Sequence, residues 1–106
     1  MNRVRFRDIK PYAVVDDLDE LQGPRTGVIE LPHRVFWQHD TRFDLSTFGG
    51  ARTAYQELLA EGQKKDLVQF LNRELLVRIW PQLRLDPRVR DLWESRFPEL
   101  VSVVVF

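Results

Sequence analysis

The chain has 106 residues, about the length of one small domain, and we expect residues 1–106 to fold as a single domain. Sixteen basic and sixteen acidic side chains give no net charge, which argues against a protein that coats nucleic acid non-specifically. Cysteine is absent, which excludes disulfides, thiol nucleophiles and cysteine metal sites. No apolar run reaches the roughly 18 residues of a membrane span, and none of signal-peptide type follows Arg3, Arg5 and Arg7. We therefore expect a cytoplasmic protein that does not enter a membrane.

The first part of the chain favours short extended segments. Residues 3–7 alternate basic and apolar side chains, as in a strand with one apolar face. Residues 26–37 are rich in strand formers but are interrupted at Pro32. A short strand pair and a single strand followed by an extended edge segment both fit this stretch. Residues 38–45 are polar, with Phe43 and Leu45 as apolar anchors.

An acidic run precedes residue 21 and comprises Asp16, Asp17, Asp19 and Glu20. Loops that bind divalent ions need fixed ligand spacing and a turn glycine, and this run has neither. We interpret it as a solvated loop or as the first turn of a helix, where acidic side chains suit the helix dipole.

A leucine-rich pattern begins after residue 45 and predicts helices. Residues 51–62 carry apolar side chains on one face and end at Gly62, a residue typical of a helix C-terminus. Residues 64–83 carry the longest apolar stripe, with leucine or isoleucine every fourth position. Asn72 interrupts this stripe. It either lies buried within one long helix or caps a second helix after a break at Leu71, and the sequence leaves both open.

Asp86 and Pro87 form the clearest boundary, because aspartate caps a helix and proline suits its first position. A third helix should follow and end before Pro98. The last residues, 101–106, favour a strand that pairs with the N-terminal strand or with another chain, which would give a homodimer. We therefore predict an α+β fold. The predicted fold has a three-helix C-terminal half and a small antiparallel sheet from the N-terminal segments. The sequence leaves open whether the C-terminal strand joins this sheet.

Catalytic and cofactor motifs are absent from the sequence. We find no nucleophile elbow, phosphate-binding loop or nucleotide fingerprint. His33 and His39 are the only histidines, and their spacing of six residues suits neither a helical zinc pair nor one strand face. We predict a non-enzymatic protein with no catalytic residue, no cofactor and no metal site.

The helical half carries a local excess of basic side chains, seven against three acidic ones between residues 64 and 90. Arginine and tryptophan are enriched at protein interfaces, so we predict a partner-binding patch made of these two residue types. The predicted patch comprises Arg73, Arg78, Trp80, Arg84, Arg88, Arg90 and Trp93.

The same basic helices have the order of a helix-turn-helix, which makes a small dimeric DNA-binding regulator the alternative hypothesis. Two features count against this alternative. The connection between the helices, residues 81–86, exceeds the usual turn, and the second helix presents Trp93 and Glu94 rather than a polar face that reads bases.

Most of the chain resembles a family of short uncharacterised bacterial proteins. The matching words are LQGPRTGVIELP (21–32), FDL (43–45), DLVQFLN (66–72), IWPQL (79–83) and VRDLWESRFPEL (89–100). Members of that family are similar to small open reading frames beside genes for nucleotidyltransferase-fold toxins of the abortive-infection type, and some are described as transcriptional regulators. The resemblance implies an antitoxin-like protein whose partner is a toxin, and it transfers no functional residue. We expect such a protein to occlude the toxin with the arginine and tryptophan patch, with the terminal strand as an edge for strand addition.

Overall fold

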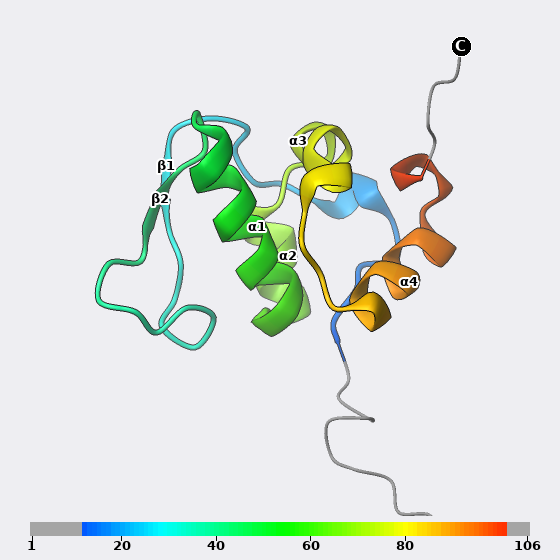
Figure 1. The fold of residues 1–106 in the computed structure, drawn as a ribbon, viewed down its shortest axis with the longest axis horizontal. Coiled ribbons are helices and arrows are strands. Elements are labelled where there is room, and N and C mark those ends of the chain that lie inside the picture. The colour runs from blue at the N-terminus through cyan, green and yellow to red at the C-terminus, as the bar shows by residue number, and fades with distance from the viewer. Residues whose placement is uncertain (1–11, 102–106) are drawn as a thin grey trace, which may run out of the picture.

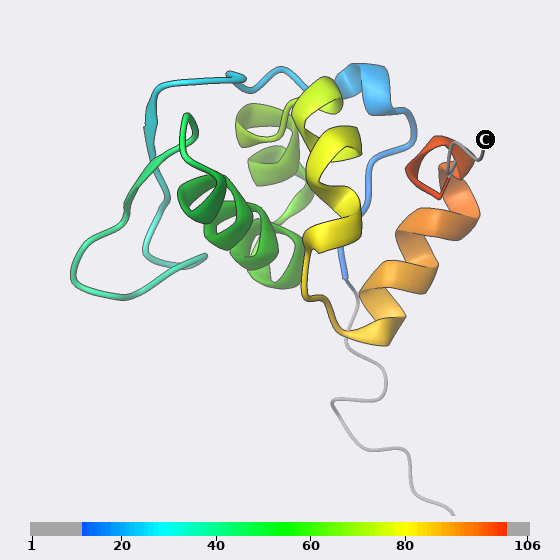
Figure 2. The same cartoon turned by 45° about the horizontal axis from the view of Figure 1, so that its top comes forward.

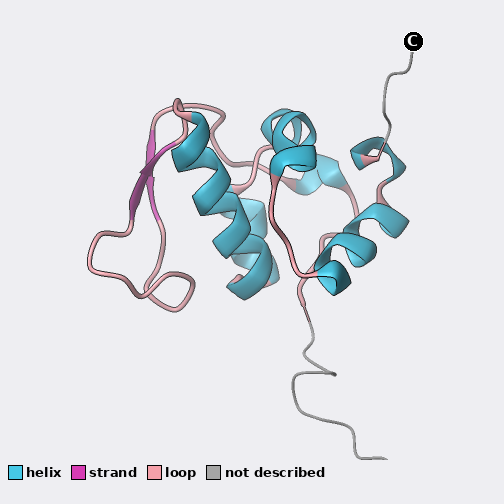
Figure 3. Cartoon of the chain, in the orientation of Figure 1, coloured by secondary structure: helices cyan, strands magenta, loops and turns pink. Residues whose placement is uncertain are grey.

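The computed structural model describes residues 12–101 and confirms the α+β class (Figures 1 and 3). The helices are α1 (Phe48–Glu61), α2 (Lys64–Phe70), α3 (Arg73–Ile79) and α4 (Pro87–Arg96). The strands are β1 (Val28–Glu30) and β2 (Arg42–Asp44), and three 3₁₀ turns are η2 (Leu18–Glu20), η3 (Trp80–Gln82) and η4 (Pro98–Leu100). In two views α3 lies between α1 and α4, with the sheet on the far side of α1 (Figures 1 and 2).

The sheet is a two-stranded antiparallel pair in which Ile29 lies opposite Phe43. The stretch 26–37 thus supplies a single strand, followed by a turn in which the Val35 amide donates to the Pro32 carbonyl. The second strand falls in residues 38–45, which the sequence presents as a polar segment. Its three residues are too few for a recognisable alternation, and its buried neighbour Leu45 leads directly into α1.

The long apolar stripe forms two helices, because Asn72 caps α3 rather than lying within one continuous helix. Its side-chain oxygen accepts from the Leu75 amide at 3.1 Å, and its own amide donates to the Tyr55 hydroxyl at 2.9 Å. The preceding residue, Leu71, has extended backbone angles and closes α2 through its bond to Leu67. The second alternative for Asn72 is therefore confirmed.

The break between α2 and α3 is held by the segment that contains Gly23. The Gln22 and Gly23 amides each donate at 2.8 Å to carbonyls at the end of α2, those of Val68 and Leu71. The Asn72 side-chain amide donates in return to the Gly23 carbonyl at 3.1 Å. These bonds satisfy carbonyls that a helix end leaves without an internal partner.

Several local predictions are confirmed by hydrogen bonds. Asp86 caps α4 by accepting from the Arg88 amide, with Pro87 at the first helical position. Within the acidic run, Asp17 caps η2 through a capping box with Glu20. The acidic run is therefore a solvated segment with one capped turn, in agreement with our interpretation.

Two predicted strands lie outside the described residues. They are residues 3–7 and, apart from Val101, residues 101–106. Val101, the residue that is described, lies in the turn after η4. The pairing of the two ends and the homodimer through the C-terminal strand therefore stay predictions. Across residues 12–101, no helix has both the length and the apolar character needed to cross a bilayer.

Gly23→Ala should destabilise the protein by about 3 kcal/mol, because an added Cβ would lie 2.2 Å from the Phe70 carbonyl oxygen. Gly49→Ala is the matched control, since a Cβ at this helical position meets nothing within 4 Å. This control should gain about 0.5–1 kcal/mol from helix propensity. Urea denaturation of both variants measures the difference, and equal stabilities would contradict the close approach at Gly23.

Tyr55→Phe should cost about 1–2 kcal/mol at neutral pH, because the Asn72 amide loses its acceptor. Burial raises the pKa of Tyr55 from 10.0 to about 12, partly offset by the bond from Asn72. The unfolded state therefore loses this proton first, and the stabilisation falls as the pH rises from 10.0 towards 12. Phenylalanine has no such dependence. The stability gap between the two proteins should narrow between pH 8 and pH 11 in urea denaturation, and a constant gap would refute the assignment.

Candidate partner-binding surface

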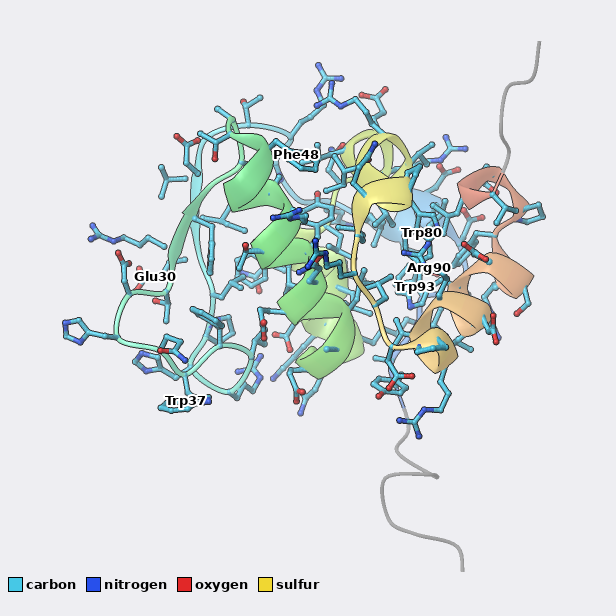
Figure 4. All side chains as sticks on the ribbon, viewed as in Figure 1. Glu30, Trp37, Phe48, Trp80, Arg90 and Trp93 are labelled. Carbon is cyan, nitrogen blue, oxygen red and sulfur yellow. The ribbon has the colours of Figure 1, made fainter. Side chains whose placement is uncertain are left out.

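The two tryptophans of the predicted patch are core residues. Trp80 and Trp93 are 1% and 0% exposed, and their ring centroids lie 6.4 Å apart between α3 and α4 (Figure 4). The Trp80 indole N–H donates to the Glu94 carboxylate at 2.9 Å. Their assignment to a binding surface is thus corrected: a residue type enriched at interfaces is also one that a small core uses for volume.

The arginines of α4 are bound within the fold. Arg88 donates from its side chain and its amide to Asp86, and these bonds hold the pKa of that carboxyl at about 2. Arg90 pairs with Glu94 at 3.3 Å, donates to the Leu83 carbonyl and lies over the Trp80 ring, 5.2 Å from its centroid. Both side chains already have a carboxylate partner within the fold, and Arg90 is the less exposed of the two.

Arg73 is likewise engaged, through ion pairs to Glu99 at 3.2 Å and to Asp19 at 3.6 Å. Seven of the ten arginines in residues 12–101 form such an ion pair. The other three are Arg52, Arg78 and Arg84. Two of these belong to the predicted patch. Arg52 does not, because the pattern of residues 51–62 indicates only the apolar face of that helix.

The three unpaired arginines gather along one face of α1. Phe48, Arg52 and Gln56 recur every fourth residue, so they share a face of that helix. The Arg52 guanidinium lies 5.3 Å from the centroid of the Phe48 ring. The Arg84 amide donates to the Gln56 side chain at 2.7 Å, which brings Arg84 beside the same face. We call Phe48, Arg52, Arg78 and Arg84 the cationic face.

Arg78 joins this face through a hollow of about 260 Å³ that is lined by residues from the start of α1 and from α3. Phe48 and Arg78 both line the hollow, and Phe48 is 50% exposed. The remaining lining residues are Leu45, Ser46, Thr47, Ala51, Leu75 and Ile79. The cationic face therefore combines positive charge with an accessible apolar depression.

A second hollow, of about 450 Å³, lies beside the loop between the strands but is braced by an ion pair. Asp66 is buried and accepts from both Arg34 and the Gln63 amide, so both of its carboxylate oxygens are engaged. His33 also lines this hollow, whereas His39 does not. Within residues 12–101, no three His, Cys, Asp or Glu side chains lie close enough together to hold a metal ion.

The exposed tryptophan of the described chain is Trp37, in the loop between β1 and β2 and far from Phe48 (Figure 4). It lines a third hollow together with Glu57 and Glu61 at the end of α1. Burial raises the pKa of Glu57, and the charge of Glu61 adds to the effect. This loop is a second exposed region, and no pattern in the sequence predicts it.

Neither a family model nor a curated protein nor a solved structure matches this chain. The resemblance to toxin-associated bacterial proteins therefore stays a hypothesis, and the surface chemistry carries the functional argument.

The burial of the tryptophans predicts a simple fluorescence result. Trp37 is 78% exposed, so acrylamide should quench its emission readily, whereas Trp80 and Trp93 should be protected. Trp37→Phe should therefore remove most of the quenchable fluorescence and leave the stability within about 0.5 kcal/mol. A quenching constant that does not fall in this variant would show that another tryptophan is accessible.

Proposed function

We propose that this chain is a non-enzymatic interaction protein that binds an acidic surface of a protein partner through its cationic face. The supporting observation is the sorting of the arginines: those of the cationic face lack a carboxylate partner among the described residues, whereas the other seven have one. Guanidinium groups form bidentate hydrogen bonds with carboxylates, and arginine is enriched at protein interfaces. An acidic partner would also relieve the mutual repulsion of these neighbouring charges.

The candidate partner is a toxin, which makes the chain antitoxin-like. This part of the proposal draws on the family resemblance. The binding would act by steric occlusion, since the cationic face offers charge and shape but needs no chemistry of its own. Association would be fast and sensitive to salt, because complementary charges steer the encounter.

A protein partner suits the cationic face better than DNA. Three arginines that each neutralise one phosphate would give a salt-dependence slope of only about −2.7, typical of weak binding. The basic side chains of α4, which a helix-turn-helix would need, are paired with Asp86, Glu94 and Asp16. Phe48 and the apolar hollow also match a protein side chain better than a phosphate chain. A DNA-binding regulator remains the alternative that the test below addresses.

The test is co-expression of the chain with the product of the adjacent gene, followed by size-exclusion chromatography at micromolar concentration. We expect one shared peak. Reversing two charges, in an Arg78→Glu and Arg84→Glu double variant, should weaken the complex about 1,000-fold, taking about 2 kcal/mol for each buried charge contact. The shared peak should then split.

The matched control reverses the same charge at two exposed arginines that already have ion pairs, Arg42→Glu with Arg96→Glu. This control should leave the shared peak intact. Separate peaks for the unmodified proteins would refute the proposal. An electrophoretic mobility-shift assay with a DNA fragment carrying the promoter of the chain's own gene tests the alternative. Retardation of this fragment that weakens with salt, without a shared peak, would favour the DNA-binding alternative.

A further inference from the structure

The hollow at the start of α1 has features that charge alone does not explain. Leu45, Ala51, Leu75 and Ile79 line it and are each at most 5% exposed, so they form a packed floor. Phe48 stands beside this floor with half of its surface in water. An exposed aromatic side chain next to an apolar depression is the arrangement into which a partner inserts an anchor residue.

The polar groups that line the hollow are occupied within the fold. The Thr47 hydroxyl donates to the Asp44 carbonyl and accepts from the Gly50 amide. The Ser46 hydroxyl accepts from the Gly27 amide at 3.3 Å. Only Arg78 brings an unpaired charge to the rim. An occupant therefore meets an apolar interior with a cation at its edge.

We infer that the occupant of the cationic face is an acidic segment of the partner that inserts one apolar side chain into this hollow. The inference rests on the proposed function and specifies the partner chemistry. A volume of about 260 Å³ has room for a leucine or phenylalanine side chain, since a cavity of about 150 Å³ holds benzene. The carboxylates of the segment would pair with Arg52 of α1 and with Arg84, whose amide bonds to Gln56 of the same helix.

The spacing of the arginines defines a pattern for this segment. Arg52 lies one turn after Phe48, and the Arg84 backbone amide bonds to Gln56, which lies about 12 Å further along the helix axis than Phe48. An extended chain covers this distance in about four residues, and alternate side chains point to the same side. The segment thus carries an apolar residue at one position and Asp or Glu two and four residues away from it. The acidic residues either follow or precede the apolar residue, because the segment can run in either direction.

Charge complementarity selects this occupant over a nucleic acid strand. Phosphates would satisfy the arginines and leave the hollow unfilled, whereas the acidic segment uses both. Arg78 also lines a separate hollow with Glu74 and Glu99, but those two carboxylates pair with Arg25 and Arg73. The Asp44 carboxylate accepts from the Ser46 amide, and no arginine of the cationic face forms an ion pair with a described carboxylate.

Fluorescence anisotropy with labelled peptides tests the inference on the full chain. The first peptide has one leucine and two aspartates at alternate positions, with serine and glycine elsewhere. A second has serine in place of the leucine, a third has asparagine in place of the aspartates, and the reversed sequence of the first covers the other direction. One of the two leucine–aspartate peptides should bind about tenfold tighter than the serine version, and the asparagine version should not bind.

Phe48→Ala should remove the tenfold preference for leucine while weak binding of the aspartate peptides persists. Trp37→Ala is the matched control, because it removes an exposed aromatic ring remote from the cationic face. Arg78→Ala, at the rim of the hollow, is a second variant that alters no packed side chain and should weaken the binding of every aspartate peptide that the unmodified chain binds.

Three outcomes would overturn the inference. The first is equal affinity for the leucine and serine peptides, and the second is no binding of any peptide at low salt. The third is displacement of the labelled peptide by an oligothymidine as effectively as by the same peptide without its label. None of them decides the proposed function, which stands or falls on co-elution with the partner. A shared peak together with equal affinities for the leucine and serine peptides would support the proposed function and contradict the insertion of an apolar side chain into the hollow.

Discussion

The junction at Asn72 governs how the helical half is arranged. An apolar stripe that would otherwise continue as one helix is broken there, and Asn72 caps the second helix with its side-chain oxygen. The carbonyls exposed at the end of α2 are taken up by the Gln22 and Gly23 amides, and Tyr55 of α1 accepts from the Asn72 amide. Three segments far apart in the sequence thus meet at one point. Leaving a buried amide or carbonyl without a partner costs about 1–3 kcal/mol, so the break persists only because all of these groups are satisfied together.

This junction also creates the candidate binding surface. Because α3 starts in a new direction after Leu71, its Arg78 comes to lie beside Phe48 and Ala51 of α1. The turn after α3 then brings Arg84 against Gln56 of the same helix. A continuous helix over residues 64–83 would carry Arg78 along one straight axis, and nothing would set it next to α1. The cationic face is therefore a consequence of the helix break.

The arginines divide into two sets because of what surrounds each of them. Arg73 and Arg96 reach the acidic run near the start of the described chain, and Arg90 is fixed between Glu94 and the Trp80 ring. Exposed ion pairs of this kind contribute at most about 1 kcal/mol each, so they direct the placement of side chains more than they stabilise the fold. Their effect is to leave the unpaired guanidinium groups concentrated on one face.

The sequence by itself determined the features that depend on neighbours in the chain. The α+β class, the helix start at Asp86 and the capped turn at Asp17 follow from periodicity and from side chains that bond within a few residues. Only the tertiary structure decided that Asn72 is a cap, that residues 42–44 form a strand, that Trp80 and Trp93 are buried, and which arginines stay unpaired. Each of these depends on a contact between segments distant in sequence, such as Asn72 with Tyr55 or Arg96 with Asp16. Composition and spacing show that a tryptophan or an arginine is present, but burial and pairing are properties of the packed neighbours that folding supplies.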